Sequence, residues 1–81
     1  MALKPDGFDK AVIGIDMTQE PYRLVYDKDK MVSIMLDEDD ELEHIDAIEY
    51  LEYNVWNTFL GPDDPIYIQR GSYDEVVDYL D

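Results

Sequence analysis

The chain has 81 residues, of which 46% are hydrophobic, and 21 acids against six bases give it a formal net charge of −15. This length predicts a single domain, 1–81, with one small core. The absence of cysteine excludes disulfides and thiolate metal sites. No apolar run is long enough to span a membrane, and the first ten residues lack the apolar core of a signal peptide, so we expect a soluble protein of a reducing compartment.

The charge is distributed unevenly along the chain. Residues 1–36 contain six acids and five bases, whereas residues 37–81 contain fifteen acids and a single base, Arg70. Nucleic acids and anionic membranes attract proteins through lysine and arginine, so both are excluded as expected partners. A basic protein surface is the partner that this charge predicts.

The first third of the chain predicts two strands and a helix. Residues 1–10 form a loose lead-in, AVIGI (11–15) has the β-branched, apolar character of a buried strand, and YRLVY (22–26) alternates like a second strand. Asp27 is a candidate N-cap for a helix that extends to about Leu36. One face of this helix is apolar: Met31, Val32, Met35 and Leu36.

A second helix follows the acidic break at residues 37–41. Asp40 and Glu43 have capping-box spacing, and Gly61-Pro62 is a typical helix end. An apolar stripe at helical spacing predicts the buried face: Ile45, Ile48, Leu51, Val55 and Phe59. The opposite face is acidic and polar: Asp46, Glu49, Tyr50, Tyr53 and Asn57.

The last part of the chain predicts a third strand and a third helix. PIYIQR (65–70) alternates like a strand, and Ser72 is a candidate cap for YDEVVDYLD (73–81). The order β-β-α-α-β-α predicts a small α+β domain in which the helices pack on one face of a short three-stranded sheet.

Three segments resemble a family of small proteins of unestablished function that bacteriophages and prophages encode. They are VYDKDKMVSIML, DELEHIDAIEYLEYNV and FLGPDDPIYI, and the similarity covers about residues 11–68. The matching positions are Tyr26, Asp27, Asp29, Lys30, Asp40, Ala47, Glu49, Tyr50, Glu52, Tyr53, Asn54, Val55, Gly61, Pro65 and Ile66. The chain departs from the family's pattern at Glu41, Glu43 and Ile45. The resemblance implies a phage or prophage origin, and hence the cytoplasm of a bacterial host cell, but no activity.

Candidate sites for metal or catalysis are weak. Glu41 and His44 have the E-x-x-H spacing of a helical-bundle metal site, but such a site needs a second histidine, and the chain has one. Calcium loops begun at Asp27 or Asp37 lack the glycine that the sixth position requires. The sequence contains no phosphate-binding glycine loop and no nucleophile motif. We therefore expect neither enzymatic activity nor a cofactor or metal.

The acidic helix face is the remaining candidate site. Its residues are Asp46, Glu49, Tyr50, Tyr53 and Trp56, and tyrosine and tryptophan are favoured at the centres of protein interfaces. The alternative is that the tyrosines lie flat at the edge of the core. The leading hypothesis is a non-enzymatic protein-binding module. A DNA-mimicking inhibitor of a host nucleic-acid enzyme and a self-assembling accessory protein, with strands that pair between chains in a homo-oligomer, remain open as alternatives.

Overall fold

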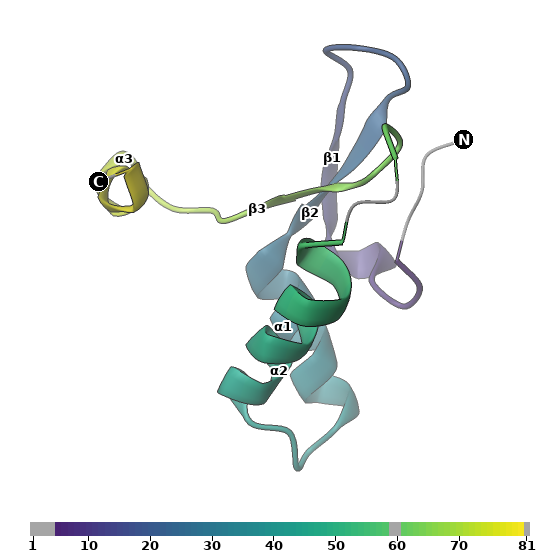
Figure 1. The fold of residues 1–81 in the computed structure, drawn as a ribbon. Coiled ribbons are helices and arrows are strands. Elements are labelled where there is room, and N and C mark those ends of the chain that lie inside the picture. The colour runs from purple at the N-terminus through teal and green to yellow at the C-terminus, as the bar shows by residue number, and fades with distance from the viewer. Residues whose placement is uncertain (1–4, 59–60, 81) are drawn as a thin grey trace.

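The computed structural model describes residues 5–58 and 61–80 as one mixed sheet with three helices (Figure 1). β1 (Val12–Asp16) is antiparallel to β2 (Arg23–Asp27), and β2 is parallel to β3 (Ile66–Ile68), so β2 is the central strand. The elements follow the order β-β-α-α-β-α. The predicted α+β class and element order are therefore confirmed.

Asp16 organises the turn that joins β1 to β2. Its carboxylate accepts hydrogen bonds from the Thr18 backbone N–H (3.0 Å) and the Thr18 hydroxyl (2.7 Å), and it pairs with Arg23 at 3.1 Å. The bonds from Thr18, more than the pair with Arg23, hold the pKa of Asp16 below its usual value.

β1 forms where the sequence predicts it, but the prediction that it is buried is wrong. Ile13 and Ile15 are 36% and 51% exposed. The reason is the position of β1 in the sheet, because it pairs with β2 on one side and lies at the sheet edge on the other.

α1 (Lys28–Glu38) begins at the predicted cap and continues two residues beyond the predicted end at Leu36. One carboxylate oxygen of Asp27 accepts hydrogen bonds from the backbone N–H groups of Asp29 (2.9 Å) and Lys30 (3.4 Å). Met31 and Val32, on the predicted apolar face, are buried. The cap and the buried face of this helix are therefore confirmed.

α2 (His44–Leu51) begins about one turn later than the capping-box pattern predicts. The Asp39 carboxylate accepts a hydrogen bond from the Glu41 backbone N–H at 3.0 Å, so the chain forms a local turn there and not the first turn of a helix. Glu43 occupies the N-cap position without a side-chain bond to the helix. The predicted Asp40–Glu43 capping box is therefore wrong.

α2 continues into a π-helical segment, Glu52–Trp56, and ends before the predicted stop at Gly61. Along the predicted apolar stripe, Leu51 is fully buried and Ile48 is half-buried, but Ile45 is 54% exposed. Ala47 takes part in the buried face in place of Ile45. Phe59, the last residue of that stripe, lies outside the described residues.

The core lies where β2, α1, α2 and a 3₁₀ turn (Asp9–Ala11) meet. Its buried apolar side chains are Ala11, Tyr26, Met31, Val32, Ala47 and Leu51. Phe8, within the predicted loose lead-in, packs against this cluster. The rings of Tyr26 and Tyr67 connect the core to β3, with their centroids 5.8 Å apart.

α3 (Tyr73–Val77) begins at the predicted Ser72 cap and is followed by a 3₁₀ turn, Asp78–Leu80. Ser72 and Glu75 form a complete capping box, which confirms this cap. α3 departs from the expected packing of the helices on the sheet, since it projects away from the rest of the molecule (Figure 1). None of its residues is buried.

Candidate partner-binding face

The outer side of α2 carries two tyrosines and two acids in one row. Asp46, Glu49, Tyr50 and Tyr53 are spaced three or four residues apart, apart from the adjacent pair 49–50, so they share one side of the helix. Tyr50 is 51% exposed and Tyr53 is 89% exposed. The tyrosines therefore do not lie flat against the core. We refer to these four residues as the acid–tyrosine face.

The acids of this face have no base beside them in the sequence. Between Lys30 and Arg70 the chain contains neither lysine nor arginine. Arg23 and Arg70 pair elsewhere, with Asp16 at 3.1 Å and with Asp27 at 3.5 Å. The face therefore presents negative charge that attracts a basic surface and is weakened by salt.

The π-helical segment holds Tyr53 in an ordered backbone. The side-chain amide of Asn54 donates to the Tyr50 carbonyl at 2.9 Å, and that of Asn57 donates to the Glu52 carbonyl at 3.1 Å. A surface hollow of about 340 Å³, lined by Glu52, Tyr53 and Asn57, lies beside the tyrosine. π-Helical turns occur frequently at functional sites, and this one places an aromatic side chain next to an acid and an amide.

Trp56 does not belong to the acid–tyrosine face. Its indole Nε1 donates to the Met31 sulfur at 3.4 Å, and the Lys28 ammonium lies 4.4 Å from the centre of its ring. In a regular α-helix, Trp56 would follow Glu49 by two turns on the same side. A π-helical turn takes about one residue more than an α-helical turn. Trp56 therefore falls short of completing the second turn and points toward α1. The structure thus places Trp56 against α1 and not in the row of the two tyrosines, and the sequence carries no signal for this change of helical period.

The structure does not bring metal ligands together at His44. His44 is exposed at the start of α2, and within residues 5–58 and 61–80 no three histidine or acidic side chains are grouped to hold a metal ion. In the same part of the chain, no helix is long and apolar enough to cross a bilayer.

Two tyrosines packed near the core have raised pKa values. Burial raises the pKa of Tyr67 to about 12, with smaller contributions from Tyr26 and Asp64. Burial, with a smaller effect of Asp9, also raises the pKa of Tyr26. Both hydroxyls therefore keep their protons at neutral pH. General acid–base catalysis needs a group that gains and loses a proton near the working pH, and neither tyrosine does so.

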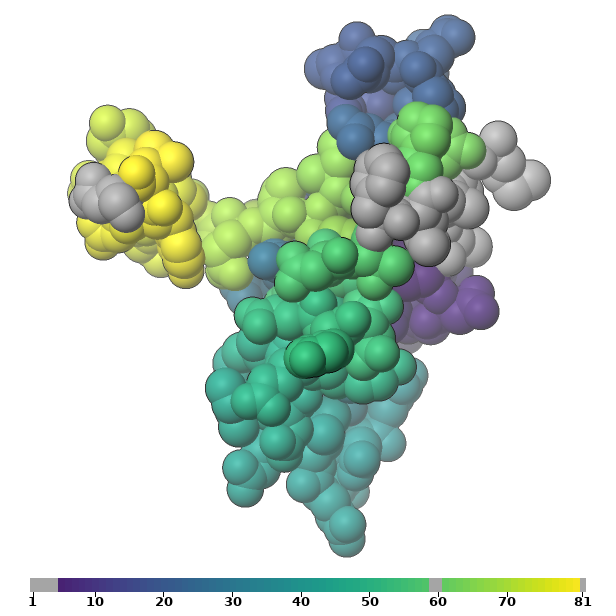
Figure 2. All heavy atoms as spheres, viewed as in Figure 1, coloured from purple at the N-terminus to yellow at the C-terminus, as the bar shows by residue number. Residues whose placement is uncertain are grey.

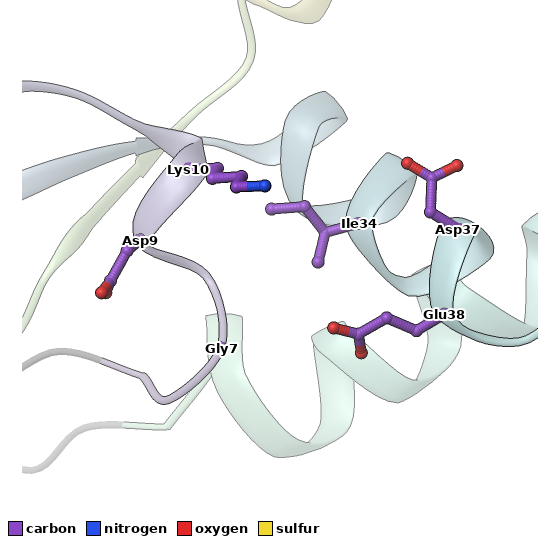
Figure 3. Close-up of a pocket in the computed structure, with 6 residues that line it drawn as sticks. All are labelled: Gly7, Asp9, Lys10, Ile34, Asp37 and Glu38. Atoms are coloured by element: carbon purple, nitrogen blue, oxygen red, sulfur yellow. The ribbon is translucent and has the colours of Figure 1, made fainter.

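Two further hollows contain ionisable groups. One of about 400 Å³ lies between the N-terminal turn and α1, and Figure 3 shows Lys10 and Glu38 extending into it from opposite sides while the Asp9 carboxylate points away. The other, of about 560 Å³, is lined by Asp27, Asp29, Gln69, Arg70, Gly71 and Val76. In this second hollow the Asp27 carboxylate is already bonded to Arg70 and to the first turn of α1, which gives it a structural role.

The chain was compared with protein-family models, with curated proteins and with solved structures, and no significant match was found. The phage and prophage resemblance therefore stays a prediction from the residues that carry it.

Proposed function

We propose that the protein is a non-enzymatic binding module whose acid–tyrosine face docks on a basic surface of another protein. The observation that carries this proposal is the 89% exposure of Tyr53 on a helix side whose acids have no neighbouring base in the sequence. A large aromatic side chain held in solvent by an ordered helix can be buried by a partner at low entropic cost. With the phage or prophage origin that the resemblance implies, the partner is a bacterial host protein.

The two residue types have different roles in this proposal. Tyr50 and Tyr53 are the anchors, because aromatic residues bury most area at interface centres and carry much of the binding energy. Asp46 and Glu49 are the steering groups, because long-range charge acts mainly on the rate of association. The proposal therefore predicts separable effects for tyrosine and acid variants.

The DNA-mimic alternative requires a charge density near that of duplex DNA. The longest dimension of the molecule is 40 Å, and duplex DNA of that length carries about 24 charges. The chain carries −15 in total. Its charge density is therefore below that of DNA, which favours the binding module over the mimic.

A pull-down from bacterial lysate with immobilised protein, eluted by salt, supplies the partner. Its affinity is then measured for the wild type and for Tyr53→Ala, which we expect to bind about 30-fold more weakly, chiefly through faster dissociation. Glu49→Gln should chiefly slow association and reduce its dependence on salt. Ile45→Ala is the matched control, because Ile45 is 54% exposed but lies outside the acid–tyrosine face.

The outcome that contradicts the proposal is equal binding by the wild type, Tyr50→Ala and Tyr53→Ala, all verified as folded by circular dichroism. The DNA mimic would replace the proposal if two results were found together. The captured partner would be a nucleic-acid enzyme for which duplex DNA competes, and the tyrosine variants would bind it as well as the wild type does.

A further inference from the structure

The C-terminal segment, residues 69–80, forms an arm that leaves the body of the molecule. Figure 2 shows it as a separate lobe, joined to the rest by a narrow neck that follows β3. The tip of the arm exposes large apolar side chains: Tyr73 at 77%, Tyr79 at 73% and Leu80 at 83%. Val76 and Val77 are half-buried, but neither packs against the core cluster. The arm therefore carries apolar surface that the body does not cover.

Local contacts fix the direction in which the arm leaves. The Gln69 side-chain amide donates to Asp29 at 2.9 Å, and Arg70 pairs with the buried Asp27 at 3.5 Å. Gly71 lies so close to α3 that a side chain there would meet the Cβ of Glu75 at 3.2 Å and a methyl group of Val76 at 3.3 Å. The base of the arm is therefore anchored to α1, and a side chain at residue 71 would crowd the first turn of α3.

The sheet has an apolar side that the core does not use. Leu24 and Tyr26 on β2 pack in the core, so Val25, between them, points to the opposite side. The register places Val25 beside Gly14 on β1 and beside Ile66 on β3, and Ile68 lies on the same side as Ile66. We call Gly14, Val25, Ile66 and Ile68 the open sheet face. Gly14 is exposed, and the other three are half-buried. None of them belongs to the core cluster or packs against it.

The exposed area of the chain is larger than that of a compact monomer. A folded monomer of 9.5 kDa exposes about 5,000 Å², whereas this chain exposes 6143 Å². Its radius of gyration is 13.5 Å, against about 12 Å for a compact domain of the same length. The excess of about 1,100 Å² exceeds the roughly 800 Å² that each partner buries in a stable complex of standard size.

We infer that two copies of the chain exchange their arms, so that α3 of each copy covers the open sheet face of the other. The arm and the face are both apolar, and both lie outside the core. Because each chain has one arm and one face, a symmetric dimer forms two identical contacts, each between the arm of one copy and the face of the other. The inference is independent of the acid–tyrosine face, since it uses neither Tyr50 nor Tyr53.

The charge distribution allows this contact. The arm carries Asp74, Glu75 and Asp78. Of the open sheet face, Gly14 and Val25 lie in residues 1–36, which contain six acids and five bases, while Ile66 and Ile68 lie on β3. Arg23 is on β2 at the end of that face, two residues before Val25. Docking on α2, where no lysine or arginine accompanies Asp46 and Glu49, would meet repulsion between the acids of the arm and those of the helix.

The first test is the mass of the full chain by light scattering over a range of concentrations. We expect a dimer of twice 9.5 kDa, and an increase of its dissociation constant by about 100-fold or more when Val77→Ser and Leu80→Ser are combined. Both residues lie outside the core, so this arm variant should fold. Tyr53→Ser is the matched control: it removes a side chain that is 89% exposed on α2 and should leave the dimer unchanged.

The second test separates arm exchange from any other dimer. A face variant, Val25→Thr, should also dissociate, but its mixture with the arm variant should form heterodimers more tightly than either variant pairs with itself. The reason is that one intact arm and one intact face meet in the mixed dimer. The cysteine-free chain permits a direct check, in which a Leu80→Cys chain and an Ile66→Cys chain, mixed and treated with oxidised glutathione as the electron acceptor, form a disulfide between copies.

Two results would overturn the inference. One is a chain that stays monomeric at every concentration up to about 1 mM, where even weak interfaces associate. The other is a dimer that the arm variant leaves intact, because a different surface would then hold the two copies together. The arm variant also separates this inference from the proposed function. It should lose the dimer and still bind the partner through Tyr53.

Discussion

α1 and α3 begin in the same way and end in different surroundings. Asp27 caps α1 and Ser72 caps α3, and each cap side chain accepts hydrogen bonds from the first turn of its helix. α1 then buries Met31 and Val32 in the core, whereas α3 buries none of its residues. A cap therefore decides where a helix starts, and it does not decide whether the helix packs.

The length of the two helices makes this difference important. α1 has 11 residues and α3 has five. A helix of five residues is too short to be stable in water by its own hydrogen bonds, since helix nucleation is costly. The body of the molecule stabilises α1, while α3 depends on its capping box and on whatever covers its apolar side chains.

The largest expected effect comes from comparing a leucine of the core with a leucine of the arm. Leu51→Ala should lower the free energy of unfolding by about 2–5 kcal/mol, because Leu51 is fully buried in the core cluster. Leu80→Ala should change it by less than about 0.5 kcal/mol, because Leu80 is 83% exposed. Urea unfolding at a concentration where the chain is monomeric measures both. Equal unfolding midpoints would place the arm in the core of the fold.

The two caps give the next largest difference. Asp27→Ala should cost about 1–3 kcal/mol, because it removes the cap of a packed helix and a buried carboxylate that also bonds Arg70. Ser72→Ala should unwind α3 while the global unfolding midpoint stays the same. Chemical denaturation reports the first effect, and amide hydrogen exchange within α3 reports the second. Asp27→Asn, which keeps a capping oxygen, is the control and should cost less than Asp27→Ala.

Alkaline pH should weaken the body through its buried tyrosine. The pKa of Tyr67 rises from 10.0 to about 12 in the folded chain, so its contribution to stability is complete below pH 10 and is lost as the pH rises toward 12. We expect the urea midpoint to fall over this interval, and Tyr67→Phe to reduce that dependence. Tyr26, whose pKa is also raised, contributes in the same direction. A midpoint that is constant in this range would mean that Tyr67 is solvated.

The smallest expected effect is confined to the arm at acid pH. The hydrogen bond from the Ser72 backbone N–H holds the pKa of the Glu75 carboxylate below 4.5. Its stabilisation of α3 is therefore present above pH 4.5 and is lost as the pH falls through the lowered value. NMR chemical shifts of α3 should show this loss while those of α1 persist. Glu75→Gln should keep α3 helical at lower pH, since glutamine completes a capping box without titrating.

Residues that act on their immediate neighbours were predictable from the sequence. Asp27 and Ser72 reveal the start of two helices, because a cap bonds to backbone groups two or three positions away. The same reasoning failed at Asp40 and Glu43, where Asp39 formed a competing turn with Glu41. Two local motifs of similar strength adjoined each other, and the sequence offers no means of choosing between them.

The candidate face was predictable in part for the same reason. The spacing of Glu49, Tyr50 and Tyr53 places them on one side of a helix, and the structure exposes all three. The position of Trp56 was not predictable, because the change from α- to π-helical turns depends on how Trp56 packs with Met31 and Lys28, 25 and 28 residues away. Contacts over such distances in the chain do not appear in local periodicity.

The sequence by itself determined the order of the elements, the caps of α1 and α3, and the separation of charge between the two halves of the chain. These depend on local hydrogen bonding, on side-chain alternation and on composition. Only the tertiary structure decided that β1 is an exposed edge, that Trp56 turns inward and that α3 stands apart from the sheet. Each of these depends on which surfaces meet across the fold, because burial is set by neighbours distant in the chain and not by the apolar character of a segment.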